Sequence, residues 1–130
     1  MGALNENSCA MLERTESVNL NAVAATTLYT VPVGKKFVPH YIVTRDLSAD
    51  AALTVCTFGQ VGALTDFLGA QTLSGLDAAA AAGILMPVPN ATTVKIIEYT
   101  AGEVFQIDVT TAAGGACTCT IEVFGTLKDA

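Results

Sequence analysis

The sequence predicts an all-β fold, a jelly-roll-like antiparallel β-sandwich with an extended N-terminal arm. Short segments rich in Thr, Val and Ile recur from residue 26 onward, separated by turns of Gly, Pro, Asn or Ala. Several of them alternate apolar and polar residues, which is typical of strands with one face in a core. The chain has no Trp and no Cys spacing that suggests an inter-sheet disulfide, so a jelly roll is favoured over an immunoglobulin-type sandwich.

The first fifteen residues differ from the rest of the chain. They show neither strand alternation nor a strong helix signal, and carry a few apolar residues such as Leu4, Met11 and Leu12. We therefore expect residues 1–15 to form an N-terminal arm and residues 16–130 to form a single β-sandwich domain. Such a segment either frays or orders as an arm against a neighbouring subunit.

The first strands of the domain are predicted at residues 17–20 and 26–31, which we expect to pair with each other. Pro32, Val33 and Gly34 form a turn, since Pro fixes one backbone angle and Gly supplies a positive φ. Residues 36–46 form the longest predicted strand, bulged or at a sheet edge because Pro39 cannot donate to a ladder. Its two predicted faces are Phe37, Pro39, Tyr41 and Val43, and Val38, His40, Ile42 and Thr44.

The middle of the chain is less regular. A strand is predicted at residues 53–59, a loop at 62–69 and a short strand at 71–73. Residues 77–82 contain a run of Ala too short to support a stable helix, so we expect a loop or a single helical turn. A strand at residues 84–88 completes this section.

The last third alternates most regularly. Strands are predicted at residues 92–99 and 104–110, joined by a turn at Ala101 and Gly102, with Phe105, Ile107 and Val109 facing inward. Residues 112–116 (AAGGA) are expected to form a hairpin tip. The final strand is predicted at residues 117–125. One of its faces carries Cys117, Cys119, Ile121 and Val123, and the other carries Thr118, Thr120, Glu122 and Phe124.

The composition favours a protein that works through contacts with other proteins. Charged residues make up 14% of the chain against 52% apolar residues, so much of the surface is expected to be covered by a partner. The formal charge of -6 and the six scattered Lys and Arg residues argue against binding to nucleic acid. We also expect no membrane association and synthesis in the cytoplasm, because the sequence has no membrane-length apolar run and no secretory signal.

No catalytic, cofactor-binding or metal-binding residue is predicted, and we expect no enzyme. His40 is the single His and no Ser lies in a nucleophile elbow, so His40 is expected to be a packed or interface residue. A small hydrolase on a sandwich scaffold is a third, less favoured function class, after a structural protein and a binding module. The acidic residues are expected to be solvated, although Asp46 and Asp50 bracket a turn and could offer two oxygens to a calcium ion.

The cysteines and the aromatic residues point to packing. Cys56, Cys117 and Cys119 are expected to be small, reduced core residues, and Cys117 with Cys119 falls short of a zinc site. Sugar-binding sandwiches display exposed aromatic platforms, and the sequence shows no obvious exposed aromatic stripe. Carbohydrate binding is therefore less favoured, but it stays an alternative. The aromatic residues are Tyr29, Phe37, Tyr41, Phe58, Phe67, Tyr99, Phe105 and Phe124.

Three segments resemble a family of small β-sandwich proteins, the decoration or cement proteins of tailed-bacteriophage heads. The resemblance is carried by residues 28–37 (LYTVPVGKKF), 101–113 (AGEVFQIDVTTAA) and 121–125 (IEVFG). It covers most of residues 17–127 and leaves out the N-terminal arm. It is a likeness of strand patterns, also found in phage fibre tips and other virion proteins, and it includes no site residue.

The resemblance implies a structural role on the virion. Members of this family form jelly-roll subunits, usually homotrimers, that sit on the capsid surface and clamp the major capsid protein. We therefore expect a capsid decoration protein that stabilises the head by bridging capsid subunits and needs no cofactor. The alternative is a receptor- or glycan-binding virion module, such as a fibre or head-fibre tip.

Overall fold

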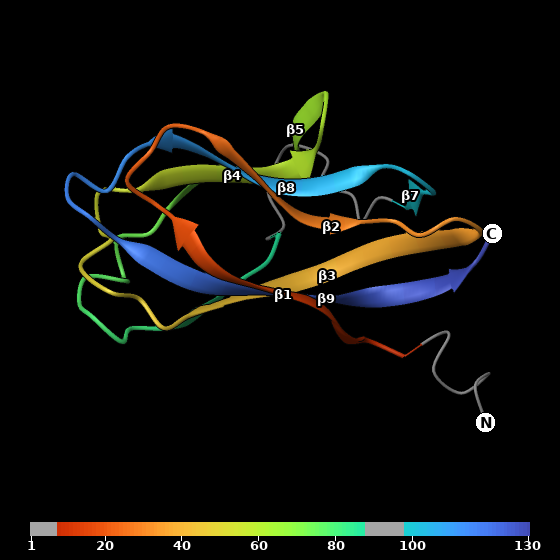
Figure 1. Ribbon diagram of the computed structural model, residues 1–130, viewed down its shortest axis with the longest axis horizontal. Helices are drawn as coiled ribbons and strands as arrows, with labels where there is room; N and C mark the ends of the chain where they lie inside the picture. Colours follow the sequence, from red (N-terminus) through yellow and green to blue (C-terminus); the bar gives the residue numbers. More distant parts are fainter. Residues whose placement is uncertain (1–7, 88–97) are drawn as a thin grey trace.

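The computed structural model describes residues 8–87 and 98–130, which form an all-β sandwich (Figure 1). Nine strands and no helix occur in this part of the chain. The strands are β1 (Ala10–Asn19), β2 (Ala25–Thr30), β3 (Lys35–Arg45), β4 (Val55–Gln60), β5 (Ala63–Thr72), β6 (Gly83–Leu85), β7 (Tyr99–Thr100), β8 (Val104–Thr111) and β9 (Thr118–Asp129).

The strands form two antiparallel sheets in the order of a jelly roll. Sheet A has the order β1-β9-β3-β6, with the short β7 also paired to β3, and sheet B has the order β2-β8-β4-β5. The chain crosses from one sheet to the other between β1 and β2, β2 and β3, β3 and β4, β5 and β6, β7 and β8, and β8 and β9. The predicted fold class is therefore confirmed.

The core lies between the sheets and is built around aromatic rings. Phe105 of sheet B contacts Phe37, Tyr99 and Phe67 edge-on, with ring centroids 5.9, 5.8 and 5.4 Å apart. Phe58 is equally buried. Each such side chain contributes about 1.5–3 kcal/mol by leaving water, so this cluster is a large part of what holds the two sheets together.

Two predicted connections are wrong because alternation does not identify a strand's partner. Residues 17–20 and 26–31 were expected to pair, yet β1 pairs with β9 in sheet A and β2 with β8 in sheet B. Residues 112–116 were expected to close a hairpin, yet they carry the chain from β8 in sheet B to β9 in sheet A. Both segments are crossovers between the sheets.

The sheet begins earlier than the predicted domain boundary at residue 16. β1 starts at Ala10, which lies opposite Gly125, and Thr15 lies opposite Ile121, so residues 10–15 belong to sheet A. Leu12 packs against the core. Residues 1–7 lie outside the described residues, and the predicted arm is limited to the residues before β1.

β3 carries the bulge that Pro39 predicts, although it is an inner strand. The register with β9 shifts between Pro39 and Tyr41, at His40. The extra residue reverses the alternation, because Phe37 is buried before the bulge and Ile42 after it. The predicted faces therefore hold only up to Pro39, and Tyr41 turns to the outer face of the sheet.

The irregular middle section contains more strand than expected. The predicted loop at residues 62–69 and short strand at 71–73 together form β5, which pairs with β4. Residues 77–82 form a turn, as expected, with Ala81 N donating to Ala78 O at 3.2 Å. The predicted strand at 92–99 lies largely outside the described residues, which resume just before β7.

Candidate docking surfaces

Four loops meet at one end of the sandwich, on the left of Figure 1. They connect β1 to β2, β3 to β4, β5 to β6 and β8 to β9, and each of them crosses from one sheet to the other. We call this surface the four-loop end. It consists of residues 20–24, 46–54, 73–82 and 112–117.

Backbone hydrogen bonds join these loops to one another. Because the donors and acceptors are main-chain groups satisfied between loops, the surface is fixed before any partner arrives. The bonds are Leu20 N to Cys117 O (2.9 Å), Ala113 N to Leu20 O (2.9 Å), Ala51 N to Leu76 O (2.9 Å) and Ala80 N to Leu47 O (2.8 Å).

The side chains of the four-loop end are small or apolar, and its only charges are acidic. Ala is its commonest residue, with an unbroken run at residues 78–82. Val23 is 67% exposed and Leu53 is 69% exposed. Asp50 accepts a hydrogen bond from Ala52 N at 2.8 Å. The segments contain no Lys, Arg or Glu.

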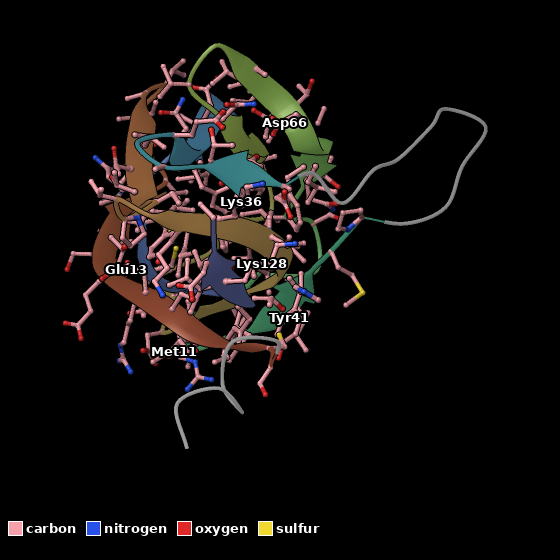
Figure 2. The ribbon with its side chains drawn as sticks, turned by 90° about the vertical axis from the view of Figure 1, so that its right-hand side faces the viewer. Met11, Glu13, Lys36, Tyr41, Asp66 and Lys128 are labelled. Carbon is pink, nitrogen blue, oxygen red and sulfur yellow. The ribbon has the colours of Figure 1, made fainter. Side chains whose placement is uncertain are left out.

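The basic residues gather elsewhere. Within the described residues every Lys and Arg lies on β1, β3 or β9 of sheet A. At the end opposite the four loops, Lys36 and Lys128 both contact Glu98, at 3.4 and 2.6 Å (Figure 2). The hydrogen bond from Lys128 is the main reason that the pKa of Glu98 is lowered. The molecule therefore has two electrostatically unlike ends.

The outer face of sheet A carries a row of large apolar side chains. Met11 lies opposite Phe124 across β1 and β9, and Phe124 lies opposite Tyr41 across β9 and β3. The Tyr41 and Phe124 rings stack with centroids 4.8 Å apart and planes 12° apart. Val43 lies opposite Ile84 on β6, and the Ile84 side chain is 61% exposed. We call these five residues the sheet A row.

Beside the sheet A row a carboxylate is held under two guanidinium groups. The Glu122 side chain is 6% exposed and lies 3.5 Å from Arg14 Nη1 and 3.2 Å from Arg45 Nε. Arg14 and Arg45 come from the two strands that flank β9. The expectation that the carboxylates are solvated is wrong for Glu122, because arginines on both neighbouring strands cover it.

A second carboxylate was also expected to be solvated and is instead part of a polar cluster. Asp66 Oδ1 accepts a hydrogen bond from the Tyr99 hydroxyl at 2.5 Å, and Asp66 Oδ2 accepts one from Gln60 Nε2 at 2.9 Å. Burial, followed by this bond to Asp66, raises the pKa of Tyr99. Nothing in the sequence signals the bond to Tyr99, because Tyr99 and Asp66 lie 33 residues apart in the chain.

The residues considered for chemistry lie in separate places. His40 is half-buried in the β3 bulge, where a ring nitrogen lies 3.0 Å from Thr126 Oγ1. Cys56, Cys117 and Cys119 are buried in the core, as predicted, and Cys9 is exposed. Burial raises the pKa of the Cys56 and Cys119 thiols to about 12.

Two findings concern metal ligands and membrane-spanning helices in the part of the chain that the structure describes. Asp46 lies 3.7 Å from Arg14, and Asp50 caps its own turn. No group of three or more His, Cys, Asp or Glu residues in that part is placed to hold a metal ion. None of its segments forms a helix of the length and hydropathy needed to cross a membrane.

Comparison with known proteins yields one structural likeness. No model of a protein family matches this chain, and no curated protein matches it. Among solved structures, it is similar to a chain in the capsid asymmetric unit of cyanophage Pam1, with a TM-score of 0.48 and 17% identity. The alignment covers 92% of this chain and 84% of that chain. We draw no functional conclusion from a likeness of this degree.

Proposed function

We propose that this protein is a structural component of a phage virion, which decorates the capsid surface and stabilises it by bridging capsid subunits. Its partners are the major capsid protein and two further copies of itself in a homotrimer. The protein is made in the host cytoplasm, has no catalytic activity and needs no cofactor. The observation that carries the proposal is the set of large apolar side chains that stay exposed on the described jelly roll, among them Val23, Leu53 and Ile84.

Bridging requires more than one contact surface, and two surfaces with exposed apolar side chains are available. The four-loop end lies at one end of the sandwich, whereas the sheet A row lies on its side. Met11 and Ile84 are 48% and 61% exposed although they are large and apolar, which is typical of a surface that a partner covers. One subunit could therefore contact the shell and a neighbouring copy at the same time.

The N-terminal arm in this proposal is shorter than the arm of residues 1–15 that the sequence predicts. It comprises the residues before β1, and β1 begins at the end of the molecule that holds Ala130 (Figure 1). Removing residues 1–7 should weaken binding to capsids if the arm orders on a neighbouring copy, because copies that are linked to one another are retained more tightly. Unchanged binding would remove the arm from the proposal and leave the rest standing.

The stacked rings of Tyr41 and Phe124 do not favour the glycan-binding alternative. Sugars pack on the open face of an aromatic ring, and in this pair each ring covers one face of the other. The alternative is therefore kept only as an outcome of the functional test.

The test combines native mass with binding to capsids. The mass of the purified chain is measured by light scattering, and the chain is then sedimented with purified capsids that lack it. We expect a trimer that co-sediments with the capsids and raises the temperature at which they disrupt. A monomer that does not bind capsids would contradict the proposal, and binding to cells or glycans would then favour the alternative.

A further inference from the structure

We propose that the four-loop end is the surface that faces the capsid shell, and that the shell protein meets it with an apolar patch rimmed by Lys or Arg side chains. This inference rests on the proposed function. It assigns an orientation to the subunit, with the four loops toward the shell and the Lys-bearing end toward solvent.

The loops of the four-loop end are ordered before a partner docks. Loops that order on binding lose conformational freedom, which weakens association. Here the loops are already joined by backbone hydrogen bonds, including Ser48 N to Thr118 O at 2.9 Å and Leu73 N to Thr54 O at 3.1 Å. The Asn21 side chain adds a further link, since its Oδ1 accepts a hydrogen bond from Gly114 N at 3.1 Å. Docking therefore requires little further ordering.

The four-loop end presents small side chains and two large apolar ones. A run of Ala at residues 78–82 and the pair Gly114 and Gly115 allow the backbone of a partner to approach closely. Val23 and Leu53 project from two other loops and are mostly exposed. An isolated exposed apolar residue is ordinary, but two of them on a fixed surface of Ala and Gly form an uncharged centre of the kind found in protein interfaces.

The acidic charge of the four-loop end indicates a partner that carries basic side chains. Asp46, Asp50 and Asp77 lie on the four-loop end, which has no basic residue of its own. Asp46 lies 3.7 Å from Arg14 of β1, whereas Asp50 and Asp77 have no such neighbour among the described residues. Two copies could not pair through this end without bringing like charges together. Asp77 makes no contact with another described side chain that would neutralise it, so a partner that supplies Lys or Arg gains from both carboxylates.

The size of the surface explains why several copies would act together. Four strands about 4.8 Å apart in two layers about 10 Å apart give an end of roughly 400 Å² once side chains are included. A stable interface buries about 800 Å² on each partner, so one subunit alone would bind weakly. Three copies held in one trimer would exceed that area and bind tightly through multivalency.

The experiment compares single charges introduced at opposite ends of the molecule. Val23→Glu and Leu53→Glu lie on the four-loop end, and Val33→Glu is the matched control, because Val33 is 95% exposed in the β2–β3 turn at the other end. Each variant is checked for fold by circular dichroism and for native mass by light scattering. Its affinity for capsids lacking the protein is then measured by co-sedimentation.

We expect Val23→Glu and Leu53→Glu each to weaken capsid binding about tenfold or more, and Val33→Glu to change it less than about twofold. Asp77→Asn should weaken binding and reduce its dependence on salt, whereas Glu13→Gln on β1 should do neither. The native mass should be the same for all of these variants.

Two results would overturn the inference while leaving the proposed function intact. The first is capsid binding that is lost in Val33→Glu and retained in Leu53→Glu. The second is a lower native mass of Leu53→Glu without capsids, which would make the four-loop end a contact between copies. Failure of the unmodified protein to bind capsids would instead contradict the proposed function itself.

Discussion

Single polar side chains join parts of this molecule that are distant in the chain. Tyr99 on β7 belongs to sheet A, and its hydrogen bond to Asp66 on β5 reaches sheet B. The Tyr99 side chain is 1% exposed, so its hydroxyl has exchanged water for this one acceptor. Removing the hydroxyl would take one donor away from Asp66 in a partly buried site, which lowers stability by more than the hydrogen bond itself adds.

We expect Tyr99→Phe to lower the free energy of unfolding by about 1–2 kcal/mol, because Asp66 loses a donor in a partly buried site. The measurement is urea unfolding followed by circular dichroism. Tyr41→Phe is the matched control, since the Tyr41 hydroxyl has no hydrogen-bond partner among the described residues. Equal losses in the two variants would show that the bond to Asp66 contributes nothing specific.

Glu103 should make stability depend on pH in one direction. Its Oε1 accepts hydrogen bonds from Thr100 Oγ1 and Thr100 N, at 2.5 and 2.7 Å. These bonds, the first being the stronger cause, lower the pKa of Glu103 below its ordinary value of 4.5. Because the folded state has the lower pKa, this stabilisation is present above the unfolded pKa and is lost as pH falls through the folded one.

The variant that tests this is Glu103→Gln, which keeps an acceptor but no charge. At pH 7 it should be less stable than the unmodified protein by under about 1 kcal/mol, because the group is largely solvated. The difference should shrink as pH falls below about 4. Urea unfolding across pH measures it, and a difference that grows toward acid would contradict the sign.

The burial of individual residues was predictable only where neighbours along the strand determine it. Phe105, Ile107 and Val109 alternate strictly, and all three are buried as predicted. Asp66 and Glu122 looked solvated, since their partners come from other strands through pairings that the sequence does not specify. The same reason hid the Tyr41 and Phe124 stack, because the bulge at His40 moves Tyr41 to the outer face.

Among the elements, the pairing of β3 with β9 imposes the tightest local requirement. Gly125 on β9 lies opposite Pro39, next to the bulge. A Cβ atom at Gly125 would lie 2.4 Å from Val38 O and 2.7 Å from the Phe37 ring. Both are held in the sheet or the core, so neither can move aside easily. A glycine is required here by close approach.

We expect Gly125→Ala to lower the free energy of unfolding by about 2 kcal/mol or more, because the sheet must shift to admit one methyl group. Gly69→Ala on β5 is the control, because a Cβ atom at Gly69 would have no neighbour within 4 Å. That variant should change stability by less than about 0.5 kcal/mol. Urea unfolding measures both, and equal effects would contradict the packing argument.

Strands whose own residues alternate between apolar and polar could be predicted from the sequence. A strand that forms because it pairs with a neighbouring strand could not. The expected strands at residues 104–110 and 117–125 match β8 and the first part of β9. Most of β5 was expected to be a loop between Gly62 and Gly69, and only its end overlaps the short strand predicted at residues 71–73. Pairing with β4 supplies the hydrogen bonds that its own sequence does not favour.

At the scale of the whole molecule, the jelly roll separates an acidic, Ala-rich end from an end that carries Lys side chains. Neither end could be recognised from the sequence. The Ala and Gly stretches are visible in four separate places, but only the alternation of strands between two sheets brings them together. The Lys residues look scattered along the chain for the same reason.

The extent of β1 leads to a prediction about truncation. Deleting residues 1–7 should change the free energy of unfolding by less than about 0.5 kcal/mol, because β1 remains whole. Deleting residues 1–15 removes Leu12 from the core and most of the pairing with β9, and should cost several kcal/mol or prevent folding. Thermal unfolding distinguishes the two, and equal melting temperatures would contradict the assignment of residues 10–15 to the sheet.

The position of β9 has a consequence for how the protein is made. β9 follows the other eight described strands in the chain, yet it lies inside sheet A between β1 and β3. Sheet A therefore cannot be completed on the ribosome before residues 118–129 have emerged, and its pairings join strands far apart in the chain, which slows folding. A chain arrested before residue 118 would leave β1 and β3 without the strand that they share, so β1 would wait unpaired, and β3 would keep one edge open, until β9 is made.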